Sequence, residues 1–107
     1  MKTNEAVQLL AALAQETRLD IVRLLIQQGP EGLPAGQIAE RLGVANATLS
    51  FHLKELSHAA VLESTQQGRF VYYRANYQAM DALVGFLMEN CCQASADGGS
   101  SANCCEP

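Results

Sequence analysis

The sequence predicts a mainly α-helical chain with one small β-hairpin, an α+β fold of the winged helix-turn-helix kind. Three observations predict it. Two short amphipathic segments, 35–42 and 46–59, meet at a tight turn that contains Gly43. Two runs rich in β-branched and aromatic residues, 61–65 and 70–75, follow directly. A further amphipathic segment lies toward each end of the chain.

The N-terminal part is expected to form two helices. In the first, apolar residues recur at helical spacing, namely Val7, Leu10, Ala11 and Ala14. The second is expected to begin near Thr17, where Thr17 and Asp20 match a capping box, and to end before Gly29 and Pro30. Residues 31–34 are expected to form a loop before the helix-turn-helix pair.

The helix-turn-helix pair has a buried side that its apolar residues define. The first helix turns inward the residues Ile38, Ala39 and Leu42. The second helix has a buried stripe of Leu49, Leu53, Leu56 and Ala60. Gly68 supplies the positive φ that the following hairpin turn needs. A hairpin placed directly after the second helix is a wing, so the whole unit occupies roughly residues 33–75.

The last helix is expected to be capped by Asn76 and to be apolar on one side. That side consists of Met80, Leu83, Val84, Leu87 and Met88. One small domain leaves little core for both terminal helices, so they are expected to form a dimer with a second subunit. The alternative is that they fold back onto their own domain. The chain is thus divided into a folded unit, 1–90, and a flexible cysteine-containing tail, 91–107.

Composition and charge narrow the class of protein. The chain has 107 residues, 49% of them hydrophobic, which is enough for one core. No apolar run approaches the ~20 residues of a membrane span, and no signal peptide is evident, so a cytoplasmic protein without a membrane partner is expected. The net charge is −4, but residues 44–75 carry three basic and two acidic side chains. This weakly basic middle favours a dimer, which would double the charge facing phosphate.

The exposed side of the second helix carries residue types that read DNA in the major groove. The expected contacts are Asn46, Ala47, Thr48, Ser50, Phe51, His52 and Lys54, with Arg69 at the wing tip. The polar members offer hydrogen bonds to bases or phosphate. Phe51 and Ala47 could touch a thymine methyl group, and Lys54 suits a phosphate. His52 lies at the edge of the leucine stripe, where a structural hydrogen bond is favoured over a base contact.

The four cysteines form two adjacent pairs, one at the end of the last helix and one at the end of the tail: Cys91, Cys92, Cys104 and Cys105. A polar, glycine-containing tail is poor core material, so a ligand role is favoured over burial. Soft thiolates select soft ions. Three thiolates suit trivalent arsenic or antimony, and the expected set is Cys91, Cys92 and one tail cysteine. Four thiolates would also suit tetrahedral zinc or cadmium.

The segments 48–56, 59–62 and 68–73 together resemble the ArsR/SmtB family of metalloregulatory repressors, and 13–19 resembles an early segment of that family. The resemblance implies a homodimer that binds an inverted-repeat operator in double-stranded DNA. It also implies release of that DNA when an inducer binds. One departure is Phe51, which stands where the family usually has a polar or basic residue.

The resemblance also bears on the inducer. The zinc sensors of the family use Asp and His on the last helix, which here has Asp81 but no histidine. The best-known arsenic sensors carry a Cys-x-Cys motif at the start of the helix-turn-helix, and residues 35–38 contain no cysteine. The chain resembles arsenite-responsive members with thiols at the end of the last helix and in the tail. As(III) or Sb(III) is therefore the implied inducer, with no organic cofactor.

Three other functions differ from this one in the signal that is sensed or in the use of the helix-turn-helix. A repressor of the same fold could sense thiol oxidation, or cadmium or zinc. A metal buffer or metallochaperone could use the helix-turn-helix only as scaffold. An enzyme is not expected, because His52 and His58 share one helix and nothing resembles a nucleophile with its base.

Overall fold

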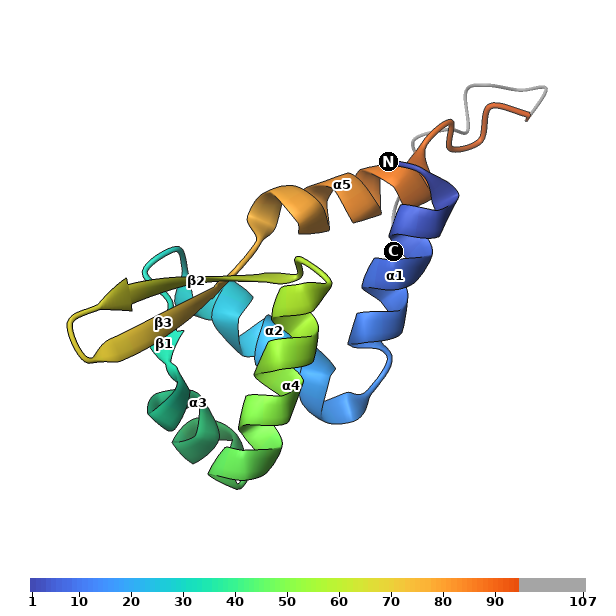
Figure 1. Cartoon of the computed structure of the whole chain (residues 1–107). Coiled ribbons are helices and arrows are strands. Elements are labelled where there is room, and N and C mark those ends of the chain that lie inside the picture. Colours follow the sequence, from blue (N-terminus) through green and yellow to red (C-terminus); the bar gives the residue numbers. More distant parts are fainter. Residues whose placement is uncertain (95–107) are drawn as a thin grey trace.

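A computed structural model gives the arrangement of the chain and describes residues 1–94. In this part the elements, in chain order, are α1 (Thr3–Leu13), α2 (Glu16–Gln28), β1 (Leu33–Pro34), α3 (Ala35–Leu42), α4 (Asn46–His58), β2 (Leu62–Gln67), β3 (Phe70–Ala75) and α5 (Tyr77–Met88). The five helices and the small sheet confirm the predicted winged helix-turn-helix. Figure 1 shows the β2–β3 hairpin extending away from the helices at one side of the molecule. Over residues 1–94, no helix combines the length and apolar character needed to cross a bilayer.

The helix-turn-helix pair lies where the sequence predicts it. Gly43 ends α3 in the left-handed conformation, with φ of 66°, and allows the tight turn into α4. Leu49, Leu53 and Leu56 are buried in the core, as predicted. Ala60, predicted as a fourth member of this stripe, is instead exposed. The helix ends at His58, and Ala60 has a φ of 62°, so the chain turns away from the helical path before reaching it.

The wing is part of a three-stranded antiparallel sheet with strand order β1-β3-β2. Strands β2 and β3 form the predicted hairpin, and Gly68 has the expected positive φ, 64°. The prediction of a loop over 31–34 is wrong for its last two residues, because Leu33 pairs with Tyr73 and begins β1. Leu33 is buried, and two residues are too few to give the alternating pattern that marks a strand.

The start of α2 differs from the predicted capping box. The helix begins at Glu16, and the side chain of Gln15 accepts a hydrogen bond from the backbone N–H of Arg18 at 3.0 Å. Thr17 and Asp20 therefore lie inside the first turns and do not cap the helix. A glutamine at this position is not among the residues that normally signal a helix start.

Helices α1 and α5 lie together at one end of the molecule, away from the wing (Figure 1). Each packs one side on its own domain, through the buried residues Ala6, Leu9, Ala12 and Leu83. The predicted apolar stripe of α1 is wrong as the side that packs on this domain, because its four residues, Val7, Leu10, Ala11 and Ala14, are all exposed. A second apolar side of the two helices faces outward and comprises Val7, Leu10, Val84, Leu87 and Met88. The terminal helices therefore fold back onto their domain and still leave an apolar surface.

Candidate nucleic-acid interface and thiol pair

The surface predicted to read DNA is presented by α4 and by the wing tip. Seven of its eight predicted residues are exposed: Asn46, Ala47, Thr48, Ser50, Phe51, Lys54 and Arg69. The opposite side of α4 is anchored in the core by leucines that are at most 2% exposed. The exposed side chains are thus held on a rigid element, which is what precise recognition requires.

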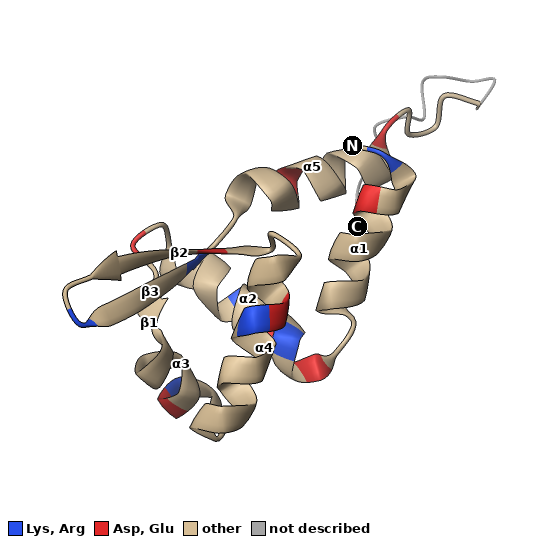
Figure 2. Cartoon of the chain, viewed as in Figure 1, with Lys and Arg blue, Asp and Glu red and all other residues tan. Residues whose placement is uncertain are grey.

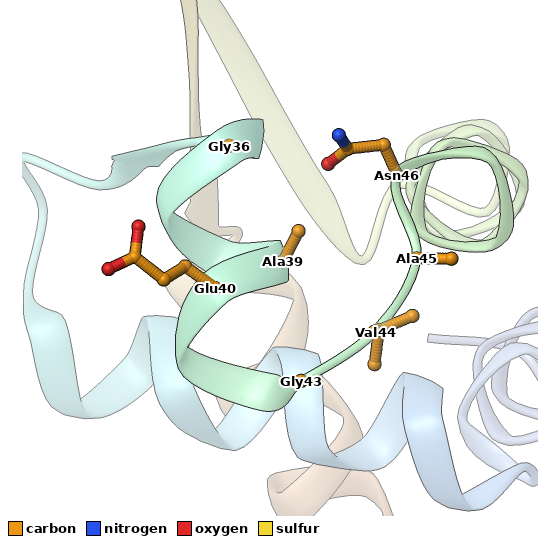
Figure 3. Close-up of a pocket in the computed structure, with 7 residues that line it drawn as sticks. All are labelled: Gly36, Ala39, Glu40, Gly43, Val44, Ala45 and Asn46. Carbon is orange, nitrogen blue, oxygen red and sulfur yellow. The ribbon is translucent and has the colours of Figure 1, made fainter.

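The start of α4 is open toward solvent. Its N-cap residue is Ala45, and no side chain caps the first turn, so backbone N–H groups there are available to an anion such as a phosphate. Figure 3 shows a hollow between α3 and this helix start, lined largely by small residues, with the Asn46 amide extending across it toward α3. Gly36, Ala39 and Gly43 leave this space because their side chains are short or absent.

His52 is the exception among the eight residues. It is only 8% exposed, and its Nδ1 accepts a hydrogen bond from Nε of Arg18 at 3.1 Å. The guanidinium carbon of Arg18 lies 5.7 Å from the ring centroid of Phe51, within the range of a cation–π contact. His52 therefore makes the structural hydrogen bond that the sequence favoured, and its place among the expected DNA contacts is corrected. The role of Arg18 was missed, because no sequence pattern connects residues separated by 34 positions.

The basic charge near this surface is sparse. Figure 2 shows Lys and Arg positions separated from one another over α2, α3, α4 and the tip of the β2–β3 hairpin, with Asp and Glu positions among them. On the wing, Nε of Arg74 pairs with Glu63 at 3.4 Å and its Nη1 donates to Thr65 at 2.6 Å. Arg74 is thereby partly neutralised. Lys54 and Arg69 are the exposed cations of α4 and of the hairpin turn.

The first cysteine pair lies directly after α5. The Sγ atoms of Cys91 and Cys92 are 3.4 Å apart, and both residues are half-buried. Asn90 and Cys92 have φ values of 59° and 60°, so the chain turns sharply here and brings the two sulfur atoms close together. Within residues 1–94, no group of three cysteine, histidine or acidic side chains is close enough to hold one metal ion. Cys104 and Cys105 lie outside the described residues.

Two sulfur atoms at this separation fit a single soft ion. With a sulfur–ion distance of about 2.3 Å, the value for zinc thiolates, a nearly right-angled pair spans about 3.3 Å and a tetrahedral pair about 3.8 Å. The observed 3.4 Å is closer to the right-angled, pyramidal arrangement. The pair therefore has the sulfur separation that two ligands of one such ion require.

Comparison with known proteins places the chain among transcriptional regulators. Residues 13–65 match the family model described as a helix-turn-helix domain. The chain is 30% identical to the transcriptional activator HlyU of Vibrio cholerae, over 85% of this chain and 82% of that protein. It is also 30% identical to the transcriptional repressor SdpR of Bacillus subtilis, over 72% of this chain and 82% of that protein. These relatives are regulators and not enzymes.

The solved structures that resemble this chain are also transcriptional regulators or domains of them. An ArsR-like transcriptional regulator from Rhodococcus sp. RHA1 has a TM-score of 0.74 and 26% identity, covering 96% of this chain and 94% of that one. The homodimeric winged helix-turn-helix domain of Mb0332 from Mycobacterium bovis has a TM-score of 0.66 and 28% identity, covering 81% of each chain. A possible transcriptional regulator for arsenical resistance has a TM-score of 0.64 and 29% identity, covering 75% and 79%.

Proposed function

We propose that this chain, which belongs to the ArsR/SmtB family of winged helix-turn-helix transcriptional regulators, is a homodimeric repressor that leaves its operator when trivalent arsenic or antimony binds its cysteine thiolates. The observation that carries the inducer proposal is the 3.4 Å separation of the Cys91 and Cys92 sulfurs at the end of α5. The DNA-binding part rests on family membership and on the exposed polar side of α4.

The operator is double-stranded DNA with an inverted repeat. The exposed side chains of α4 enter the major groove, led by Asn46, Thr48 and Ser50, which hydrogen-bond to base edges or phosphates. Lys54 and Arg69 neutralise phosphates on either side of that groove. With so few cations a single chain binds DNA weakly, so the second DNA-binding domain of the dimer is needed for a useful affinity for the operator.

The dimer forms through α1 and α5. Their outward side bears large apolar residues that are 42–61% exposed: Val7, Leu10, Val84, Leu87 and Met88. Burying this surface against the same surface of a second copy would remove it from water, and a two-fold axis would match an inverted repeat. The structurally similar Mb0332 domain is a homodimer, which supports this arrangement.

The inducer site begins with Cys91 and Cys92, whose sulfur separation fits a pyramidal ion. One of Cys104 and Cys105 completes the three thiolates. The similarity to a possible regulator for arsenical resistance supports arsenic over other soft ions. When bound, the ion draws the tail toward the end of α5.

Release follows because α5 belongs to both the thiol site and the proposed dimer interface. Binding at the end of α5 changes how the two copies of this helix meet, and the spacing of the recognition helices changes with it. A coupling free energy of about 1–3 kcal/mol would weaken operator binding by roughly 5–150-fold. By the same linkage, DNA weakens the binding of the ion by an equal factor.

The test measures arsenite-driven release of the full-length protein from its upstream DNA by fluorescence anisotropy. The wild type should bind DNA without arsenite and release it with arsenite, whereas Cys91→Ser and Cys92→Ser should bind and no longer release. Gln93→Ser, an exposed change in the same segment, is the matched control and should respond like the wild type. Unchanged release by both cysteine variants would overturn the proposed inducer site.

Further arms of the same assay separate the other functions. Release by peroxide and not by arsenite would indicate a thiol redox sensor. Release by cadmium or zinc alone would indicate a tetrahedral metal site. A protein that binds arsenite but shifts no DNA specifically would be a metal buffer, and the repressor proposal would be wrong.

A further inference from the structure

The ring of Phe51 lies in an unusual setting on the recognition helix. Its side chain is 56% exposed although it is aromatic, and it is surrounded along α4 by polar and small residues. An exposed phenylalanine gains little from its own domain, so its position must be set by specific contacts. Two such contacts are present, one with His52 and one with Arg18.

Arg18 reaches this ring from α2. Its guanidinium carbon lies 5.7 Å from the Phe51 centroid, and its Nε donates to Nδ1 of His52 at 3.1 Å. His52 in turn meets Phe51 edge-on, with ring centroids 5.6 Å apart and an interplanar angle of 63°. The three side chains thus form a closed cluster in which each contacts the other two.

The backbone of Arg18 is also held in place. Its backbone N–H donates to the side chain of Gln15 at the start of α2, and its side chain is half-buried between α2 and α4. Over residues 1–94, the one ion pair is Arg74 with Glu63, so no carboxylate draws the guanidinium of Arg18 away from the ring. The cluster therefore restricts the orientations that the Phe51 ring can adopt.

We propose that Arg18 is a positioning residue that fixes the Phe51 ring of the recognition helix so that the ring reads the methyl group of a thymine in the major groove. The thymine methyl is the apolar feature that a phenylalanine can recognise there. This inference rests on the proposed DNA-binding function. Arg18 acts through Phe51 and does not itself touch the base.

The experiment removes the methyl group chemically. The wild-type protein first selects a duplex from a random library, and each thymine of that duplex is then replaced singly by uracil. At one thymine in each half-site, the wild type should lose about fourfold in affinity, the value of one buried methyl-sized group. Phe51→Ala should show less than twofold loss at that same position.

Arg18→Gln should also reduce the effect of uracil to less than twofold, although Phe51 is still present. Arg18→Lys retains the charge but not the planar guanidinium, so it should behave like Arg18→Gln. Arg23→Gln removes an exposed arginine of the same helix and should keep the fourfold effect. Thermal unfolding of each variant checks that the domain is intact, and Arg18→Lys serves if Arg18→Gln does not fold.

The outcomes distinguish this inference from the proposed function. If the wild type selects no sequence, the proposed function fails. If it selects a sequence but no thymine responds to uracil, Phe51 does not read a methyl group and the inference is wrong. If Arg18→Gln weakens binding to all duplexes, retains the uracil effect and lowers the salt dependence, Arg18 is a phosphate contact and the positioning role is overturned.

Discussion

Gly32 offers a sharp test of how the wing is attached to the helical core. This buried residue immediately precedes β1 and has a φ of 74°, which an L side chain rarely adopts. A Cβ placed here would overlap the carbonyl oxygen of Tyr73 and lie 2.9 Å from its carbonyl carbon. Because Tyr73 is the β3 partner of Leu33, Gly32→Ala must push β1 away from the sheet.

The magnitude follows from two contributions. A left-handed alanine costs about 1 kcal/mol, and forcing a side chain into a filled site adds about 1–3 kcal/mol. Gly43→Ala is the matched control, because Gly43 has a similar φ of 66° but nothing within 4 Å of its added Cβ. We therefore expect the free energy of unfolding to fall by about 2–4 kcal/mol for Gly32→Ala and by about 1 kcal/mol for Gly43→Ala.

Urea denaturation followed by circular dichroism measures the difference, at one fixed protein concentration because a dimer would make stability concentration-dependent. The denaturation midpoint should fall in the order wild type, Gly43→Ala, Gly32→Ala, with similar slopes. Equal midpoints for the two variants would mean that the close approach to Tyr73 has no energetic effect, and the reasoning would be refuted.

Three further changes test other parts of the molecule. Asn76→Ala removes the acceptor that caps the Ala79 N–H (3.2 Å) and the donor to the Ala60 carbonyl (2.8 Å). Urea denaturation should therefore report a free energy of unfolding lower by about 1–2 kcal/mol, and an unchanged midpoint would contradict this. Lys54→Ala should weaken binding to all duplexes equally and lower the salt slope by about 1, whereas altered base preference would argue against a phosphate contact. Leu87→Glu should give a helical monomer by analytical ultracentrifugation and weaken operator binding, because Leu87 is 58% exposed on α5; a persistent dimer would exclude this surface.

The helix-turn-helix and the wing could be predicted because their signals are local. Gly43 and Gly68 mark the two turns, and both have the positive φ that the sequence requires. The leucines of α4 recur at helical spacing, so the exposed side followed from the buried one. Strand β1 could not be predicted, because its two residues become a strand only by pairing with β3, which lies almost forty positions later.

The candidate site was predictable in part for the same reason. The exposed residues of α4 follow from the period of its buried leucines. The contact of Arg18 with His52 and Phe51 depends on how α2 crosses α4, and no spacing along the chain encodes that crossing. The closeness of the Cys91 and Cys92 sulfurs depends on two left-handed residues just after α5, and a cysteine, unlike Asn90, rarely adopts that conformation. Neighbouring positions in the sequence indicated a pair but not its geometry.

The sparse charge of the reading surface bears on how a small change at α5 can remove the protein from DNA. Arg74 is paired with Glu63, which leaves Lys54 and Arg69 as the main exposed cations of α4 and the hairpin turn. A single DNA-binding domain with so few phosphate contacts binds weakly. In a dimer, simultaneous binding of two half-sites raises the affinity for DNA by about 10²–10⁴-fold. That gain in affinity disappears if the two DNA-binding domains no longer match the spacing of the half-sites. An ion at the end of α5 therefore need not alter the recognition helix itself, because a change in the angle between two copies of α5 is sufficient.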